Sequence, residues 1–254
     1  MDAVRPQIVA FGGGGFSMEA GNTLLDDYVV GLAGRQRPRV CFLPTASGDA
    51  DHYVTRFYRA FDAHRCEPSH VSLFRRDPGV ADVREHLLSR DLIYVGGGSV
   101  VSLLGTWRAH GIDSILRDAW QSGVILCGLS AGSLCWFEKG VTAFHGPPAA
   151  IQGLGFLPWS NCVHFDAEPQ RCSAYRRMLA EGMCQGYAAE DGSALHFVGE
   201  ELHRVVSSRP EARAHRMRVE GGRVVRRALP ATYLGAERPA SAPARRGRLR
   251  VVAA

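Results

Sequence analysis

Long hydrophobic runs are missing from this sequence of 254 residues. No stretch reaches the roughly 18 uninterrupted apolar residues that a membrane-spanning helix requires. The first residues, MDAVRPQIVAFGGGG, lack the basic start and the extended apolar core of a signal peptide. The seven cysteines are scattered, without a CxxC pair or a Cys/His cluster at zinc-ligand spacing. We therefore expect a cytoplasmic protein with reduced cysteines, no metal and no membrane association.

Lysine is nearly absent as well, since Lys139 is the single lysine among 30 basic residues. The formal net charge is +5, but the arginines form no stripe with interleaved aromatic residues. Nucleic acid is therefore not predicted as a partner. The exception is residues 236–254, which combine arginine with alanine and proline and are typical of a disordered end. We expect a single domain over residues 1–235, followed by this tail.

Short apolar runs alternate with segments of helical period over the first half of the chain. This alternation predicts βαβ units in an α/β fold, with a mostly parallel sheet covered by helices on both faces. After residue 140 the pattern predicts shorter strands and antiparallel hairpins, and so a β-rich C-terminal edge. The expected strands include 7–11, 39–47 (with a Pro/Thr/Ser turn at its end), 69–74, 91–95, 124–128, 162–165 and 193–198, and the expected helices include 51–64, 78–89 and 170–183.

Ser130 lies in a G-x-S-x-G motif, Gly128-Leu129-Ser130-Ala131-Gly132, directly after an apolar strand. A nucleophile on a sharp strand-to-helix turn needs small neighbours, so that the backbone fits and its hydroxyl projects clear of the sheet. The helix expected next would aim its first N–H groups at the same place, where negative charge develops during acyl transfer. The motif therefore predicts Ser130 as a nucleophile.

Two glycine runs, 94–100 (YVGGGSV) and 11–17 (FGGGGFS), follow other predicted strands. In a parallel sheet these turns emerge at the same edge as Ser130, where active sites of open α/β sheets form. The first run is the natural source of a second N–H donor for an oxyanion. A phosphate-binding loop is disfavoured, because neither run has G-x-G-x-x-G spacing with an acidic residue about 20 positions later, or a GK[ST] ending.

A serine nucleophile needs a base, and two histidines after residue 130 are candidates. His164 ends a short apolar strand in NCVHFDAEPQR, while His145 lies in a Gly/Pro loop. The orienting acid is open on these grounds: Glu190 and Asp191 precede a strand, and Asp166 and Glu168 lie beside His164.

Five segments in this order, FLPTAS, YVGGGS, GLSAGSLCWF, GLGFLP…HFD and EDGSAL, resemble the peptidase E (α-aspartyl dipeptidase) family, which is related to cyanophycinase. The resemblance covers residues from about 7 to 230. It implies a flavodoxin-like fold similar to class I glutamine amidotransferases, with serine in place of their cysteine. It also implies a triad in the chain order Ser, His, acid.

Carried onto this sequence, the resemblance implies Ser130 as nucleophile and His164 as base. It implies an oxyanion hole made by the N–H groups of Gly98 and Ala131. The register D-G-S-A-L selects Asp191 as the acid, with Glu190 in reserve.

The resemblance also implies substrate contacts. Arg171 is the nearest match to the arginine that reads the substrate's aspartate in relatives, and Arg176 and Arg177 are alternatives. Two departures from the family pattern, Ser99 in place of asparagine and the lack of an aspartate in GVTAFHG, bear on substrate preference.

We expect a serine exopeptidase, a dipeptidase that hydrolyses short peptides with an N-terminal aspartate through an acyl-enzyme and without a cofactor. The alternatives are a cyanophycinase-like hydrolase of β-aspartyl-arginine and a non-catalytic amidotransferase-like binding module. The expected partner is a small peptide substrate, and the protein is expected to be a monomer or a homodimer.

Overall fold

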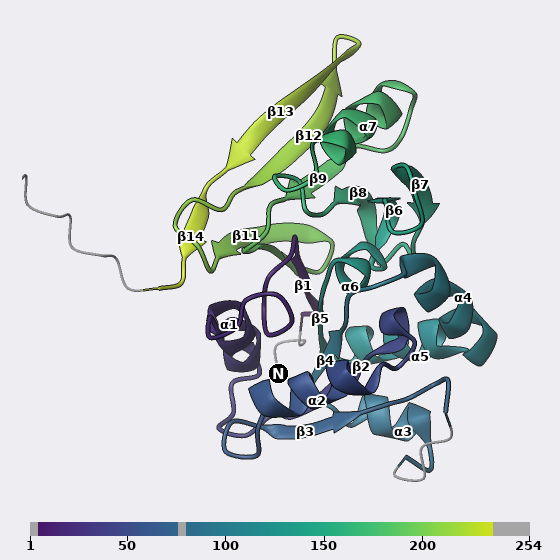
Figure 1. The fold of residues 1–254 in the computed structure, drawn as a ribbon, viewed down its shortest axis with the longest axis vertical. Helices are drawn as coiled ribbons and strands as arrows, with labels where there is room; N and C mark the ends of the chain where they lie inside the picture. The colour runs from purple at the N-terminus through teal and green to yellow at the C-terminus, as the bar shows by residue number, and fades with distance from the viewer. Residues whose placement is uncertain (1–4, 76–79, 236–254) are drawn as a thin grey trace, which may run out of the picture.

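The computed structural model describes residues 5–75 and 80–235, and it divides the strands between two sheets (Figure 1). The first sheet has the order β14-β11-β10-β1-β5-β4-β2-β3. Its strands are β1 (Gln7–Phe11), β2 (Arg39–Leu43), β3 (Glu67–His70), β4 (Leu92–Val95), β5 (Ile125–Leu129), β10 (Ser193–Val198), β11 (Glu201–Ser207) and β14 (Ala231–Tyr233). The block from β1 to β3 is parallel, and β10 runs antiparallel to both β1 and β11.

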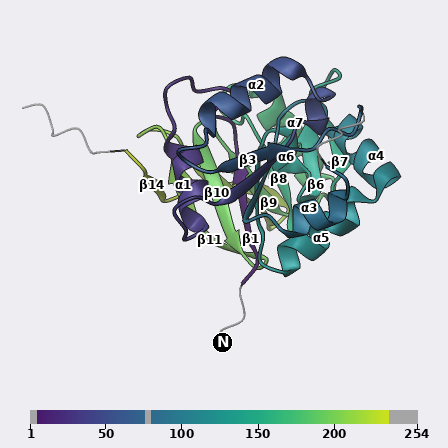
Figure 2. The same cartoon turned by 90° about the horizontal axis from the view of Figure 1, so that it is seen from below.

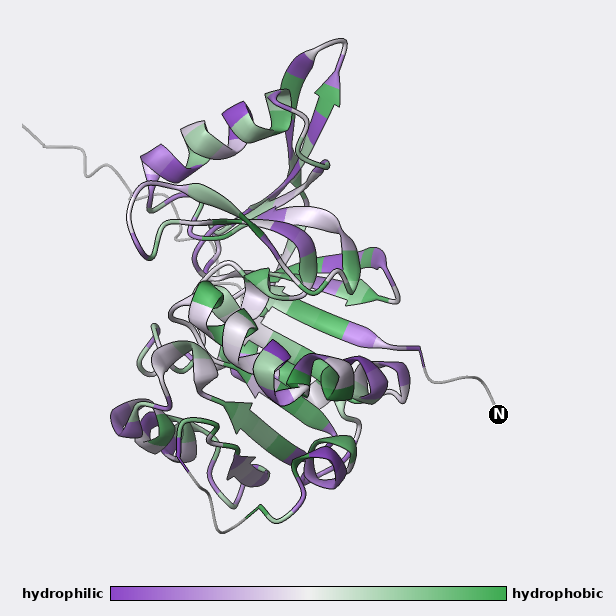
Figure 3. Cartoon of the chain, turned by 90° about the vertical axis from the view of Figure 1, so that its right-hand side faces the viewer, coloured by the Kyte–Doolittle hydropathy of each residue, from purple (hydrophilic) through white to green (hydrophobic). Residues whose placement is uncertain are grey.

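Helices cover both faces of the first sheet. The helices α1 (Leu24–Leu32) and α2 (Asp51–Ala60) lie on one face; α3 (Val83–Leu88), α4 (Val100–His110) and α5 (Ile112–Gln121) lie on the other (Figure 2). Alternation along the strands produces this arrangement, because successive side chains point to opposite faces. Ile8 and Ala10 enter one core cluster, whereas Val9 and Phe11 enter the other. The buried strands appear as apolar bands between the helices (Figure 3).

The second sheet has the order β13-β12-β9-β8-β6-β7 and carries helix α7 (Pro169–Ala180). Its strands are β6 (Phe137–Thr142), β7 (Ala149–Gln152), β8 (Leu157–Cys162), β9 (Gly186–Ala189), β12 (Ala214–Glu220) and β13 (Arg223–Leu229). The two sheets share one core: Phe197 of β10 meets the rings of Phe137 and Tyr187 with centroids 5.7 and 5.4 Å apart. Burial of these aromatic side chains ties the second sheet to the first.

The predicted α/β class, the mostly parallel sheet and the helices on both faces are confirmed, but the single sheet is a correction. The C-terminal strands do not form one edge: β10, β11 and β14 extend the first sheet, while β12 and β13 complete the second. The strands β6 to β8 interleave polar and apolar residues in short runs, so their sequence carries little periodic signal. One of the antiparallel hairpins expected after residue 140 forms as β12 and β13.

Two predicted strands are also displaced. The strand expected at 162–165 lies earlier, at Leu157–Cys162, and the strand expected at 69–74 lies at Glu67–His70. The latter is an edge strand, where Pro68 is tolerated. It ends early because the N–H groups of Leu73 and Phe74 donate to the carboxylate of Asp49. Residues 76–79 and the predicted tail, 236–254, lie outside the described part of the chain.

The loop after β1 is anchored in the core by Phe16. Its ring packs against an aromatic cluster from the first sheet and α2, made of Phe42, Tyr53, Phe57, Phe61 and Tyr94. Asp26 of α1 is fully buried close to this loop, and burial raises its pKa to about 7, with Arg65 opposing the shift only in part.

Asp26 makes stability fall as pH rises. The folded-state pKa of about 7 exceeds the ordinary 3.8, so the folded chain holds a proton that the unfolded chain has lost between these values. Above pH 7 the full loss applies, and Asp26 lowers the free energy of unfolding by roughly 4 kcal/mol relative to low pH. We expect Asp26→Asn to stabilise the protein by a few kcal/mol at pH 8 and to have little effect at pH 4, in urea titrations. The control is Asp27→Asn, at an exposed neighbour paired with Arg65. A gain independent of pH would contradict this.

Candidate active site

Ser130 occupies a strained turn between β5 and the helix α6 (Ala131–Leu134). Its φ of 53° and ψ of −112° are rare for a residue with a side chain. The flanking glycines are required: a Cβ on Gly128 would lie 2.5 Å from the carbonyl oxygen of Gly132, and one on Gly132 would meet the carbonyl of Val95. The helix expected after Ser130 is present as a single turn. The tight turn predicted for the G-x-S-x-G motif is therefore present.

His164 lies two residues beyond the end of β8, and its side chain bonds to Asp191. Nδ1 lies 2.6 Å from Oδ1 of Asp191, and the two side chains are only 14% and 13% exposed. Because a carboxylate oxygen accepts, Nδ1 donates, and Nε2 is the nitrogen that can accept a proton from a serine. The N–H of His164 donates to the carbonyl of Gly12 at 3.1 Å, and the N–H of Asp191 donates to the carboxylate of Asp166 at 2.9 Å.

Glu190 points to a different partner. Its carboxylate lies 2.9 Å from Nε2 of His215 and accepts the N–H of Arg213 at 2.8 Å. The structure thus brings Asp191, and not the reserve residue Glu190, to His164. The other histidine candidate, His145, lies 2.7 Å from Oγ of Ser99 and does not bond to either acid in this structure.

The glycine run 11–17 lies against the His164–Asp191 pair. A Cβ on Gly13 would lie 2.9 Å from the carboxyl carbon of Asp191 and 2.9 Å from Cε1 of His164. A Cβ on Gly12 would meet the carbonyl of Glu190. This close approach explains why residues 12 and 13 are glycines. The glycine run was visible in the sequence, but its contact with His164 and Asp191 was not.

Gly98 and Ala131 both line the pocket that contains Ser130. The neighbours of Gly98 are engaged elsewhere, because the N–H of Gly97 donates to the hydroxyl of Tyr53 and that of Ser99 to the carbonyl of Ala46. Gly98 has a φ of 137°, and a Cβ there would clash with Ala46. The carboxyl ends of β4 and β5 lie in register, Val95 beside Gly128, which brings the two turns together.

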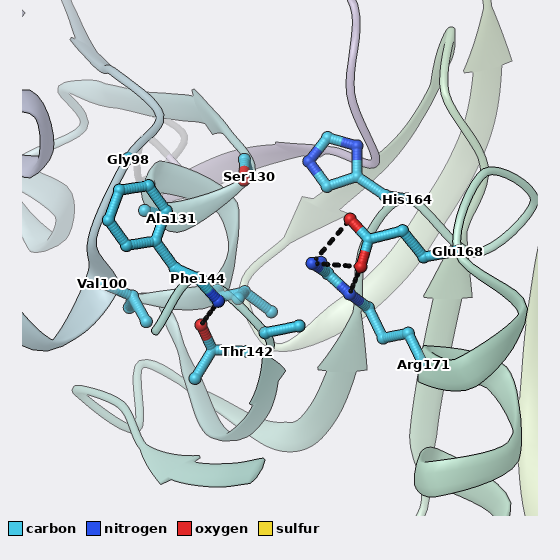
Figure 4. A pocket seen from close by; sticks show the side chains of 11 residues that line it. Gly98, Val100, Ser130, Ala131, Thr142, Phe144, His164, Glu168 and Arg171 are labelled. Carbon is cyan, nitrogen blue, oxygen red and sulfur yellow. Dashed lines mark hydrogen bonds and ion pairs between the residues drawn. The ribbon is translucent and has the colours of Figure 1, made fainter. Parts of the chain in front are cut away.

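The pocket has a volume of about 280 Å³, near the lower end for small-molecule sites. Its lining includes Ser130, His164, Phe144, Glu168 and Arg171 (Figure 4). Of the three arginine candidates, Arg171 lines it, while Arg176 and Arg177 are exposed on the outer side of α7. Within the described residues, no group of three or more His, Cys, Asp or Glu side chains is arranged to hold a metal ion.

Arg171 is already paired. Its Nε and Nη2 donate to the two carboxylate oxygens of Glu168, both at 2.9 Å, and its Nη1 donates to the carbonyl of Val163 at 3.2 Å. The arginine side chain is 8% exposed and that of Glu168 is 43% exposed. Glu168 was among the candidates for the orienting acid in the sequence, and the structure instead pairs it with Arg171. Its i, i+3 spacing to Arg171 was the signal for this pair.

The fold and the site together define a serine peptidase, and the comparisons identify its family. The model of peptidase family S51 matches residues 8–205, a span that includes Ser130, His164 and Asp191. The chain belongs to this family of serine peptidases, which confirms the predicted resemblance. No helix in the described ranges is both long and apolar enough to cross a bilayer.

One curated protein and two solved structures that the chain resembles are also peptidases by name. The chain is 48% identical over 230 residues to the uncharacterized peptidase YgaJ of Bacillus subtilis (strain 168), covering 90% of this chain and 99% of that protein. Among solved structures, a peptidase from an acI-B1 Actinobacterium has a TM-score of 0.69 at 17% identity, with 90% and 96% of the chains covered. A putative peptidase E protein from Listeria monocytogenes EGD-e has a TM-score of 0.57 at 15% identity, with 89% and 100% covered. These two similarities concern the fold.

A fluorophosphonate that labels active-site serines separates the two acids without knowledge of the substrate. We expect Asp191→Asn to slow labelling of Ser130 by about 10³- to 10⁴-fold, because His164 loses its orienting acceptor. Glu190→Gln is the matched control and should label within a few-fold of the wild type. Equal losses in both variants would assign the histidine's orientation to the turn as a whole instead of to Asp191.

Gly13→Ala tests the close approach of the loop. The added methyl group displaces Asp191 or His164, so we expect labelling to slow on the order of 100-fold. The control is Gly31→Ala in α1, where a Cβ meets nothing within 4 Å. Circular dichroism and the melting temperature report whether both variants fold. Wild-type labelling in folded Gly13→Ala would show that the loop does not constrain the pair.

Proposed function

We propose that this protein hydrolyses short peptides from their N-terminus by acyl transfer to Ser130, with aspartate preferred as the N-terminal residue. The observation that supports this most strongly is the His164–Asp191 hydrogen bond at a pocket that also holds Ser130. In the first step, the hydroxyl oxygen of Ser130 attacks the peptide carbonyl while Nε2 of His164 takes its proton.

The remaining steps use the same residues. The N–H groups of Gly98 and Ala131 stabilise the tetrahedral oxyanion, a contribution of about 3 kcal/mol per donor. The C–N bond then breaks, and His164 returns the proton to the leaving amine. Water attacks the acyl-enzyme with His164 as base, releasing the N-terminal residue and regenerating Ser130. The pocket's small volume favours a short substrate.

The preference for aspartate rests on Arg171. Its guanidinium lines the pocket and is buried, so a hydrogen bond from it to a substrate carboxylate is shielded from water. Glu168 and Val163 engage three of its five N–H groups. A substrate carboxylate therefore shares this arginine with Glu168.

A second candidate is hydrolysis of β-aspartyl-arginine. The observation in its favour is the half-exposed carboxylate of Glu168 at the pocket, which suits a cationic side chain. Asp166, the other acid close to His164 in the sequence, accepts the N–H of Asp191 instead. The alternative of a non-catalytic module is set aside, because the chain belongs to a serine peptidase family.

A dipeptide panel tests both candidates. We expect the wild type to cleave Asp-Ala with a higher kcat/KM than Asn-Ala, Glu-Ala, Ala-Ala or β-Asp-Arg, and Ser130→Ala to cleave none of them. Arg171→Gln should reduce the preference for Asp-Ala over Ala-Ala by about 10- to 100-fold, since a charged hydrogen bond is lost.

The matched control is Arg177→Gln, which removes an exposed arginine from the same helix. An unchanged aspartyl preference in Arg171→Gln would remove Arg171 from substrate selection. Preferred cleavage of β-Asp-Arg would favour the second candidate.

A further inference from the structure

The Glu168–Arg171 pair is asymmetric with respect to the pocket. Arg171 is the buried partner, fixed by a two-point contact to Glu168 and by the carbonyl of Val163. Glu168 is the exposed partner, and its carboxylate faces the pocket between His164 and Arg171 (Figure 4). Although Glu168 is the N-cap residue of α7, its side chain makes no capping hydrogen bond. Helix capping therefore does not account for this carboxylate.

Glu168 is also held at a fixed position relative to the base. Its N–H donates to the carbonyl of His164 at 3.2 Å, and its own carbonyl accepts the N–H of Arg171 at 2.9 Å. Two consecutive turns of the chain, residues 164–168 and 168–171, thus carry the base, the carboxylate and the arginine. Preorganisation of this kind lowers the entropic cost of using the group for binding.

A peptidase that removes the N-terminal residue places a positive charge close to its nucleophile. The α-nitrogen is separated from the scissile carbonyl carbon by one Cα, which makes that distance about 2.5 Å. When Ser130 attacks that carbon, the ammonium group therefore lies inside the same pocket. Among the described residues that line this pocket, Glu168 is the only carboxylate.

We propose that Glu168 binds the α-ammonium group of the substrate's N-terminal residue and so makes this pocket specific for unblocked peptides. The inference rests on the proposed function. In the free enzyme Arg171 holds the Glu168 carboxylate, which compensates the charge of both groups. An N-terminal aspartyl residue carries the complementary pair of charges, with its ammonium directed to Glu168 and its side-chain carboxylate to Arg171.

The dependence of activity on the substrate's charge distinguishes this role from that of a purely structural ion pair. If the Glu168–Arg171 pair only stabilised the turn, a substitution of Glu168 would affect peptides with a free and with a blocked N-terminus equally. Binding of an ammonium group instead requires the negative charge of Glu168. Glu168→Gln keeps the length of the side chain and one acceptor for Arg171 while it removes that charge.

The first experiment compares Asp-Ala with N-acetyl-Asp-Ala. We expect Glu168→Gln to lower kcat/KM for Asp-Ala by about 10- to 100-fold and to leave that for the acetylated peptide within a few-fold. The matched control is Glu181→Gln, which removes a carboxylate from an exposed pair with Arg177 just beyond the same helix. Equal effects on the free and acetylated peptides would overturn the proposal.

The second experiment measures binding without turnover. Calorimetry on Ser130→Ala gives the Kd of Asp-Ala and of N-acetyl-Asp-Ala, and the same titrations are run on Ser130→Ala/Glu168→Gln. We expect the preference for the free amine to fall by about 10- to 100-fold in the double variant. An unchanged preference overturns the proposal even if the acetylated peptide is too slow a substrate to assay.

Different results would contradict the proposed function and the proposed role of Glu168. If the wild type cleaves no peptide of the panel, the proposed function fails, and the binding titrations still decide the role of Glu168. If the wild type cleaves Asp-Ala and Ser130→Ala does not, but Glu168→Gln retains the preference for a free amine, only the role of Glu168 is wrong.

Discussion

The 2.6 Å hydrogen bond between His164 and Asp191 depends on how the two sheets meet. His164 follows the end of β8 in the second sheet, and Asp191 lies in the turn where the chain leaves β9 of the second sheet and enters β10 of the first. Ser130 comes from β5 at the centre of the first sheet. The three side chains therefore converge only if the sheets keep their relative position. The shared core around Phe197 supplies that constraint.

Backbone strain is concentrated at the same site. Ser130 and His164 are two of the three described non-glycine residues with positive φ. Such conformations cost on the order of 1–3 kcal/mol each and persist where the surroundings fix them. For His164 the loop after β1 provides these surroundings: the carbonyl of Gly12 accepts its N–H, Gly13 leaves room for the His164–Asp191 pair, and Phe16 anchors the loop in an aromatic cluster. The buried Asp26 adds a further cost near this loop.

The sequence predicts the local features of this site well. The G-x-S-x-G motif follows directly from steric needs within five residues, and the structure shows the close contacts that exclude larger side chains. The parallel strands were predictable because β1, β2, β4 and β5 are continuous apolar runs. The second sheet was not, because its strands are short and partly polar, and their pairing is set by contacts between distant segments.

The choice between Glu190 and Asp191 also depends on contacts between distant segments, which the sequence does not show. Glu190 and Asp191 are adjacent, and both precede a strand, so composition and spacing do not distinguish them from first principles. The turn decides: Glu190 is directed to His215 and Arg213 on β12 and its preceding loop, and Asp191 is directed to His164. Only the resemblance, through its register, selected the same residue.

The charge of the pocket depends on the ion pair between Glu168 and Arg171, and not on Arg171 alone. Taken alone, Arg171 suggests a cationic site for an acidic side chain. With Glu168 bound to it through two hydrogen bonds, the pair is close to neutral, and its exposed part is the carboxylate. A substrate that carries only a negative charge would have to compete with Glu168 for Arg171. Under the roles proposed for Glu168 and Arg171, a substrate that carries both charges meets a complementary partner for each, and selection for a free N-terminus and for an acidic first residue would share one ion pair.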